Sequence, residues 1–446
     1  MAVGGVSGCA RDPGRGSRRV SRVERVRITG IAAGGAGVGR QSDGRVVFVH
    51  RTAPGDEAEV RVVESKRRWA RGELVRLREA GPGRREAPCP HYDRCGGCTL
   101  EHLEYSAQLA AKSRIVADAL RRIGGLELVN PEVVPSPEEF RYRNRVSFTL
   151  LRLGGGRVVA GFHEIGRPGR VVDITEACLL PEAPIAAAWG RLRAEWGHAA
   201  SRLPSGDRLR LTLRASSVGE IALVVDGGYA PGRPEELLER VPELTAIWHR
   251  PERGPREFRL LAGQETLRES WADEELGLSG AVFLQVNRGA AALLEEHVTA
   301  LAGDVAGRRV VDAYCGIGLH ARRLARQGAE VVGIELDELA VEEARATAPP
   351  GATFVAGRVE THLRDALPAD LVILNPPRAG LDAAVPEALR ADPPGRAIYI
   401  SCNPATLARD LERVQPVLRV KSVRCFDLFP QTSHVETVVE LRCATS

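Results

Sequence analysis

Cys402 is the residue whose setting best predicts covalent chemistry. It follows an apolar run at 398–400 that reads as a buried strand, and it stands in the segment Ser-Cys-Asn-Pro at 401–404. A thiol at a strand end can act as a nucleophile, although an isolated cysteine is more often a buried structural group. Glu436 begins another predicted strand and could serve as a general base, an exposed strand glutamate being the alternative.

A glycine-rich loop upstream predicts a cofactor site. Residues 312–318 read Asp-Ala-Tyr-Cys-Gly-Ile-Gly, and the strand that follows ends at Glu335. Gly316 and Gly318 let the backbone turn tightly beside a ligand, and an acid at the end of the second strand can accept both ribose hydroxyl protons. The spacing also satisfies the dinucleotide fingerprint, which keeps a nicotinamide-dependent dehydrogenase open as an alternative.

Two features favour S-adenosylmethionine over a dinucleotide. Asp312 suits a cationic amino-acid tail better than a pyrophosphate, and a later strand ends at Asn375, in Asn-Pro-Pro-Arg. Ligands of open parallel sheets lie beyond the carboxyl ends of the strands, so Asn375 and Cys402 should border one crevice. A nicotinamide enzyme has no need of that pair. Cys402 together with a base such as Glu436 suits uracil, whose C5 becomes nucleophilic only after a thiolate adds to C6 and must then lose its proton.

These side chains require a parallel sheet to position them. Apolar runs at 310–311, 331–334, 371–374 and 397–400 alternate with helical stretches, which is typical of a doubly wound sheet. We therefore expect an α/β fold with its catalytic domain at 281–446.

The preceding residues read differently. Residues 81–280 predict a mostly β central domain, with a helix at 106–123 that we expect to pack on the catalytic domain. Five short alternating strands at 21–80 predict a small OB-like barrel, preceded by a flexible basic tail at 1–20.

Charge is distributed unevenly along the chain. The whole sequence carries +4, whereas residues 1–85 hold 19 Arg and Lys against 9 Asp and Glu, a net +10. A basic module of this kind fits contact with RNA phosphates, although a general preference for arginine is the alternative. Arg143 and Arg145 alternate onto one strand face and are further candidates for RNA contact, a solvated edge being the alternative.

Composition also indicates the cellular compartment of the protein. The sequence has no apolar run of about 18 residues, and the arginine-rich start lacks the apolar core of a signal peptide. We expect a cytoplasmic protein that does not enter a membrane. Its nine cysteines are then expected to remain reduced.

Several segments together resemble the RNA uracil-5 methyltransferase family. They are Ser-Cys-Asn-Pro-Ala-Thr-Leu-Ala-Arg-Asp at 401–410, Asp-Leu-Phe-Pro-Gln-Thr-Ser-His-Val-Glu at 427–436 and Phe-Leu-Gln-Val-Asn at 283–287. Residues 312–318 match the family's first motif, and the barrel resembles a TRAM domain, so the likeness covers nearly the whole chain.

The resemblance implies a Rossmann-like class I methyltransferase domain and a role for each candidate residue. Cys402 would be the nucleophile and Glu436 the base. Gln285, Tyr314 and Glu335 would contact S-adenosylmethionine, and Phe283 would stack against a uracil flipped out of its helix.

The resemblance also accounts for a cysteine-bearing segment. Cys89, Cys95 and Cys98, with Cys178 far downstream, form a four-thiolate set that chemistry alone would allow for zinc or an iron–sulfur cluster. The likeness favours a [4Fe–4S] cluster, in the subfamily that carries both cluster and TRAM domain. It points to a monomer acting on RNA rather than DNA, with 23S rRNA favoured over tRNA. A non-catalytic RNA-binding relative is the remaining alternative.

Two positions depart from the family pattern. Members usually have a small polar residue where Leu319 stands and an aspartate where Asn375 stands. An amide both donates and accepts hydrogen bonds and removes one attraction for a sulfonium. We expect cofactor binding to survive with altered affinity or base preference.

Overall fold

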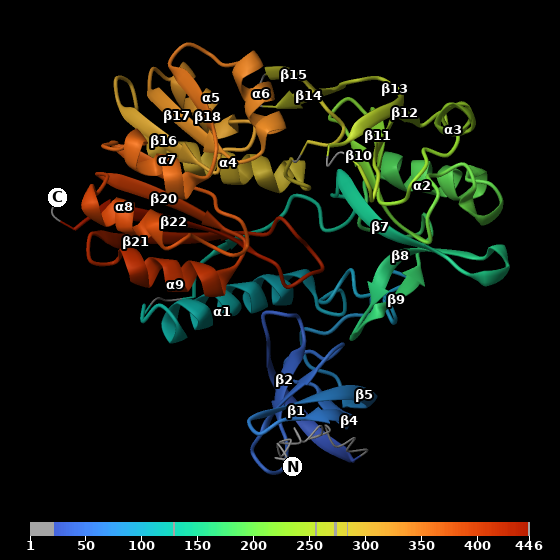
Figure 1. Cartoon of the computed structure of the whole chain (residues 1–446). Helices are drawn as coiled ribbons and strands as arrows, with labels where there is room; N and C mark the ends of the chain where they lie inside the picture. The colour runs from blue at the N-terminus through green and yellow to red at the C-terminus, as the bar shows by residue number, and fades with distance from the viewer. Residues whose placement is uncertain (1–21, 128–129, 255–256, 272–273, 283, 445–446) are drawn as a thin grey trace, which may run out of the picture. The chain divides into compact units, whose positions relative to one another are not determined.

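The structure is a computed structural model that describes residues 22–127, 130–254, 257–271, 274–282 and 284–444. The predicted tail at 1–20 and the candidate stacking residue Phe283 lie outside these ranges. The chain divides into two compact units, Met1–Arg84 and Arg85–Ser446. Figure 1 colours the chain from blue at its start to red at its end.

The first unit contains a closed five-stranded barrel, which confirms the predicted OB-like fold. Its strands follow the order β1-β2-β3-β5-β4 around the barrel. Alternation buries one side of each strand, as with Val47 and Val49, while the intervening residues face outward. The strands are β1 (Val23–Ile31), β2 (Gly37–Arg40), β3 (Val46–Val49), β4 (Glu57–Ser65) and β5 (Trp69–Glu79).

One of the sheets in the second unit has seven strands, in the order β13-β12-β11-β10-β7-β8-β9. These strands are β7 (Arg145–Arg152), β8 (Val158–Glu164), β9 (Arg167–Asp173), β10 (Arg208–Ala215), β11 (Ile221–Asp226), β12 (Leu244–Arg250) and β13 (Arg259–Gly263). A hairpin of β14 (Leu267–Trp271) and β15 (Glu274–Leu278) follows the sheet.

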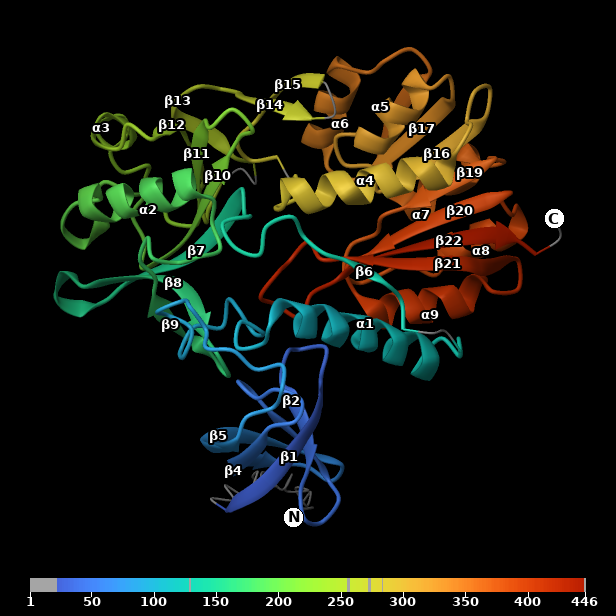
Figure 2. The same ribbon diagram turned by 180° about the vertical axis from the view of Figure 1, so that it is seen from behind.

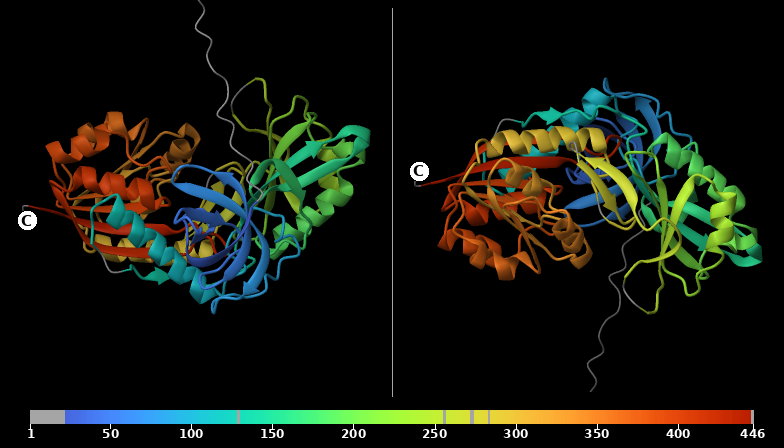
Figure 3. Two further views of the ribbon diagram at one scale, coloured as in Figure 1. Left: turned by 90° about the horizontal axis from the view of Figure 1, so that it is seen from below. Right: turned by 90° about the horizontal axis from the view of Figure 1, so that it is seen from above.

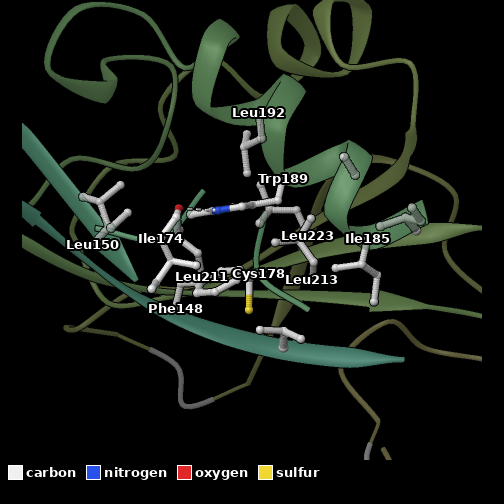
Figure 4. Close-up of a cluster of buried hydrophobic side chains, with 14 of the residues drawn as sticks. Phe148, Leu150, Ile174, Cys178, Ile185, Trp189, Leu192, Leu211, Leu213 and Leu223 are labelled. Atoms are coloured by element: carbon white, nitrogen blue, oxygen red, sulfur yellow. Dashed lines mark hydrogen bonds between the residues drawn. The ribbon is translucent and has the colours of Figure 1, made fainter. Parts of the chain in front are cut away.

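Helices α2 (Ala183–Glu195) and α3 (Pro234–Arg240) pack apolar side chains into the core of this sheet. Trp189 of α2 stacks on Phe148 at 4.1 Å between ring centroids, and its indole N–H donates to the carbonyl of Ile174 at 2.8 Å. Figure 4 shows this core, with the sulfur of Cys178 at its edge.

The catalytic sheet has eight strands in the order β18-β17-β16-β19-β20-β22-β21-β6. Neighbouring strands from β18 to β20 run parallel, and β22 is antiparallel to both β20 and β21. The strands are β6 (Val133–Val134), β16 (Arg309–Ala313), β17 (Glu330–Glu335), β18 (Ala352–Ala356), β19 (Leu371–Leu374), β20 (Arg396–Ser401), β21 (Leu418–Phe426) and β22 (Glu436–Cys443). This is the predicted Rossmann-like α/β arrangement.

Two groups of helices cover the catalytic sheet, and each group shares a separate apolar core with it. One group consists of α4 (Arg288–Ala302), α5 (Leu319–Arg326) and α6 (Glu338–Ala346). The other consists of α1 (Tyr105–Arg122), α7 (Val359–Ala366), α8 (Ala384–Ala391) and α9 (Pro404–Val414). When the molecule is seen from behind, α4 faces the viewer (Figure 2). The views from below and above show the strands between the helices (Figure 3).

Residues early in the chain complete the catalytic sheet. Val116 and Leu120 of α1 share a core with Leu407 and Leu411 of α9, and β6 pairs with β21 as the edge strand. Across the described ranges, no helix is both long and apolar enough to cross a bilayer.

Candidate active site

The loop between β16 and α5 has the backbone that its glycines predict. Tyr314, Gly316 and Gly318 all have positive φ, at 64°, 57° and 76°. A side chain at Gly318 would collide with the ring of Phe354, whose nearest atom lies 2.3 Å from the place of a Cβ. Glycine is therefore required there both by conformation and by space.

Glu335 closes this loop from the end of β17. Its Oε2 accepts a hydrogen bond from the backbone N–H of Gly316 at 3.0 Å, and its Oε1 accepts from those of Leu336 and Asp337 at 2.7 and 2.9 Å. The carboxylate is thus held at the carboxyl end of the sheet, beside the glycine loop, where open α/β sheets bind their ligands.

Asp312 offers a polar atom suited to a cationic ligand. The residue is fully buried, and its Oδ2 accepts from the backbone N–H of Ala321 at 3.0 Å. Its Oδ1 accepts no hydrogen bond from the described residues. Burial raises the pKa of Asp312 to about 6, although the nearby His320 opposes the shift. A buried acceptor without a partner fits the amino-acid end of S-adenosylmethionine.

His320 forms a buried pair with Glu295 of α4 next to this loop. His320 Nδ1 lies 2.9 Å from Glu295 Oε2. Burial disfavours the charged imidazole, but Glu295 and Asp312 outweigh it and raise the pKa of His320 to about 9. The imidazole beside the glycine loop is therefore charged at neutral pH and paired with Glu295.

The remaining cofactor candidates lie around the same end of the sheet. The backbone N–H of Asn375, just after β19, donates to Ala313 at 3.2 Å. Leu319, the first residue of α5, packs in a small apolar cluster with Leu284. Gln285 is half-buried, and its carbonyl accepts from the side chain of Asn144 at 2.9 Å.

Cys402 lies in the two-residue link between β20 and α9. Asn403 fixes this link, because its Oδ1 accepts from Ala405 N–H and its Nδ2 donates to the carbonyl of Arg378, both at 3.1 Å. The thiol is half-buried and lies within the electrostatic influence of Arg378. Burial and the nearby Glu436 raise the pKa of Cys402, while Arg378 opposes the increase.

Glu436 reaches the same place from the first position of β22 and is only 6% exposed. Burial raises its pKa to about 7, and Arg378 again opposes the shift. Ser401 pairs with Thr437 between antiparallel β20 and β22, so the structure brings Cys402 and Glu436 to the same end of neighbouring strands, within reach of the charge of Arg378. Sequence reasoning did not single out Arg378, whose only signal was its place three residues after Asn375.

His434 completes this surrounding. Its ring packs edge-on to Phe429, with 5.9 Å between centroids. The residue reaches solvent, yet the protein around the ring and the charges of Arg378, Arg143 and Lys112 lower its pKa to about 4. His434 is therefore neutral at physiological pH, and it shares the charge of Arg378 with Cys402 and Glu436.

The two arginine candidates occupy different surroundings. Arg143 precedes β7, and its Nε donates to the hydroxyl of Tyr142 at 3.3 Å. Arg145 begins β7 on the central sheet, where burial and the charges of Arg214 and Arg210 lower its pKa to about 10. Of these two arginines, Arg143 is the one whose charge helps to lower the pKa of His434, a neighbour of Glu436 in the chain.

The four candidate metal-binding cysteines converge on one core. Cys95, Cys98 and Cys178 are buried in the central core, and Cys89 packs against it. Burial raises the pKa of Cys178 to about 12, and the thiols of Cys89 and Cys95 add to the shift. Among the described residues, no three Cys, His, Asp or Glu side chains are arranged to hold a metal ion as they stand.

Three family models match parts of the sequence. A model described as tRNA (Uracil-5-)-methyltransferase matches residues 358–443, the TRAM domain model matches residues 17–75, and a general methyltransferase domain model matches residues 310–393.

The relatives match over almost the whole chain. An uncharacterised RNA methyltransferase of Gloeobacter violaceus is 38% identical over 442 residues, covering 93% of this chain and 95% of the relative. One from Synechocystis is 34% identical, covering 93% and 94%. The crystal structure of the tRNA (uracil-54, C5)-methyltransferase of Pyrococcus abyssi, in complex with S-adenosyl-L-homocysteine, is 28% identical with a TM-score of 0.71, covering 94% of this chain and 100% of that one.

These matches confirm the resemblance and the predicted enzyme class, and they remove the dehydrogenase and the non-catalytic relative as alternatives. Since a relative and a solved structure match nearly the whole chain and the family models match its parts, the chain belongs to the S-adenosylmethionine-dependent RNA uracil-5 methyltransferase family.

Proposed function

We propose that this enzyme forms 5-methyluridine in RNA, with Cys402 as the nucleophile and Glu436 as the base. The observation that carries this proposal is the pairing of β20 with β22, which brings the thiol and the buried carboxyl group to the same end of neighbouring strands, where both feel the charge of Arg378. The cation favours the thiolate of Cys402, the form that attacks carbon. A glutamate with a pKa near 7 can take a proton at neutral pH and release it again.

Each group has one task in this reaction. The Cys402 thiolate adds to uracil C6, which makes C5 nucleophilic, and Glu436 later takes the C5 proton so that the thiolate can leave. S-adenosylmethionine supplies an electrophilic methyl group on its sulfonium. The residues that would hold it at the carboxyl end of the sheet are Asp312, Tyr314, Gly316, Gly318, Glu335, Gln285 and Asn375.

RNA containing 5-fluorouridine tests the nucleophile directly. Fluorine at C5 blocks proton removal, so the proposal expects an enzyme–RNA adduct that survives denaturing electrophoresis. Cys402→Ala should abolish the adduct, whereas Cys443→Ala, at the far end of β22, should form it at the wild-type rate. An adduct that persists in Cys402→Ala would refute the assignment.

The RNA substrate is proposed to be 23S rRNA. A tRNA is the second candidate, because the similar Pyrococcus enzyme is described as acting on uracil-54 of tRNA. Phe283, Arg143 and Arg145 are the proposed RNA contacts. Mapping 5-methyluridine in both RNA pools of a strain lacking the enzyme distinguishes the two, since only the true target loses the modification.

We also propose that Cys89, Cys95, Cys98 and Cys178 hold a [4Fe–4S] cluster. Their burial around one core supports this, and a four-iron cluster holds its thiolates farther apart than a single zinc ion does. Methyl transfer needs no electron, so the cluster would serve structure or RNA contact. Anaerobically purified protein should contain iron and sulfide and absorb visible light. Zinc alone, or a metal-free colourless protein, would refute it.

Other expectations stay part of the proposal. The enzyme would act in the cytoplasm as a monomer, on RNA rather than DNA, with domains at 21–80, 81–280 and 281–446.

A further inference from the structure

Gln431 lies in the loop 427–435, which leads from β21 into Glu436. It is fully buried and has a φ of 68°, in the left-handed region. For a residue other than glycine such a backbone is strained, and it persists only where surrounding contacts hold it. The contacts of Gln431 therefore have a task in shaping this loop.

The backbone of Gln431 is bonded on both sides. Its carbonyl accepts hydrogen bonds from the N–H groups of Thr99 and Leu100, both at 2.9 Å, and its own N–H donates to Gln108 Oε1 at 2.9 Å. Thr99 follows Cys98 directly, and Gln108 lies on α1. The loop is thus bound at one residue both to the cysteine-bearing segment 88–103 and to α1.

The side chain of Gln431 extends this connection. Its Oε1 accepts from Gln108 Nε2 at 2.8 Å and from Arg85 Nη2 at 3.0 Å, and its Nε2 donates to the carbonyl of Glu139 at 3.2 Å. All four polar groups of the residue are therefore satisfied by segments that precede it by almost 300 residues or more.

The neighbouring residues are held in the same way. The N–H of Ser433 donates to Thr99 Oγ1 at 3.2 Å, and the hydroxyl of Tyr142 donates to the carbonyl of Pro430 at 2.9 Å. The link that carries Cys402 is held by other hydrogen bonds, in which Asn403 accepts from Ala405 N–H and donates to the carbonyl of Arg378. None of the residues that bond Gln431 takes part in these two bonds.

We propose that Gln431 is a positioning residue that holds Glu436 for removal of the C5 proton, by binding the loop 427–435 to the cysteine-bearing segment and to α1. This inference rests on the proposed function. It predicts that loosening Gln431 slows the second half of the reaction and leaves the first half intact.

The two halves differ in bonds made and broken. In the first, Cys402 Sγ bonds to C6, and C5 takes the methyl carbon as its bond to the sulfonium sulfur breaks. In the second, Glu436 takes the C5 proton, the C–H electron pair restores the C5=C6 double bond, and the Sγ–C6 bond breaks to return the thiolate. A displaced base therefore leaves a methylated enzyme–RNA adduct.

Single-turnover reactions of Gln431→Ala with RNA carrying tritium at uracil C5 test this. Transfer of the methyl group into protein-bound RNA should stay within about twofold of wild type. Tritium release should slow by about tenfold to a hundredfold, as a displacement near 1 Å can cause, so that adduct accumulates. Glu436→Gln is the reference for a complete block.

Gln415→Ala is the matched control. Gln415 also links the catalytic domain to the α1 segment, through its Nε2 and the carbonyl of Gly124 at 3.4 Å, but at the opposite end of that helix. Both of its rates should equal those of wild type.

If Gln431→Ala does not fold, Gln108→Ala tests the role of Gln431 instead. It removes the α1 partner, keeps Gln431, and should show the same selective slowing to a smaller degree. Equal slowing of both halves, or tritium release at the wild-type rate, would overturn the role of Gln431. A wild-type protein that forms no adduct even with 5-fluorouridine RNA would instead overturn the proposed function, and this inference with it.

Discussion

The raised pKa of Glu436 gives a direct prediction of how the reaction depends on pH. Burial raises its pKa to about 7, and a base must be deprotonated to act. Tritium release from C5 should therefore increase about tenfold per pH unit below pH 7 and level off above it. Arg378→Met removes the cation that opposes the shift, so the same profile should move to higher pH. A release rate independent of pH in both proteins would contradict the assignment.

Asn375 raises a separate question about the methyl donor. Its backbone is fixed by Ala313, so a change of side chain should leave the loop in place. Asn375→Asp adds a carboxylate near the proposed position of the sulfonium, and we expect tighter binding of S-adenosylmethionine by about 1 kcal/mol. Calorimetric titration measures this, with S-adenosylhomocysteine, which lacks the charge, as the control ligand. Equal effects on both ligands would point to a cause other than charge.

The sequence identified some of these residues and could not identify others. Cys402 and Glu436 stand out because each follows or begins a strand in a motif with chemical meaning. Arg378 and Gln431 do not, since their importance comes from partners far away in the chain, such as Thr99 and Gln108. No periodicity or local spacing contains that information.

At the scale of elements, α1 contributes a buried cation to the loop before β22. Lys112 and Asp427 are both fully buried and form an ion pair, and Lys112 also donates to the carbonyl of Phe429 at 3.1 Å. Burial lowers the pKa of Lys112, opposed by Asp427. The pair thus holds α1 against the loop 427–435 by charge as well as by packing.

Removing one member of this pair should be costly. Lys112→Met leaves an unpaired buried carboxylate and should lower the free energy of unfolding by about 3–5 kcal/mol. The double variant Lys112→Met with Asp427→Leu should lose less than Lys112→Met alone, because no charge is then left unpaired. Denaturant titration of the Arg85–Ser446 unit compares them. A double variant that loses as much as the sum of the single variants would show that the residues act independently.

Elements with strong local patterns could be predicted, and elements defined by tertiary pairing could not. The alternating apolar runs gave β16, β17, β19 and β20, and the predicted helix at 106–123 corresponds to α1. Residues 81–280 are mostly β as predicted, but the pattern did not indicate α2 and α3, which lie among those strands. Strand β6 has only two residues, too few for any periodicity, and exists because β21 offers it an edge.

At the scale of the whole molecule, the barrel is a compact unit with its own core. Part of its positive charge is neutralised by exposed ion pairs such as Arg25–Glu57 and Arg78–Glu59, which contribute little stability. The net excess of Arg and Lys over residues 1–85 still favours contact with phosphates.

Deleting residues 1–84 should therefore separate binding of RNA from binding of the methyl donor. The remaining unit retains both cores of the catalytic sheet, so it should bind S-adenosylmethionine with unchanged affinity. Its affinity for RNA should fall at least about tenfold, with a shallower dependence on salt. Filter binding over a series of salt concentrations measures both. Unchanged RNA affinity would place the main contacts in the second unit.

The place of β22 has a consequence for how the enzyme is made. It follows every other strand in the sequence, yet it lies inside the sheet between β20 and β21 and begins with Glu436. A ribosome therefore releases all other strands before the sheet can close, and β21 with β6 must leave a gap for the last strand. Until then the nascent chain has the proposed nucleophile but lacks the proposed base, so synthesis of β22 should be the step that completes the proposed catalytic pair.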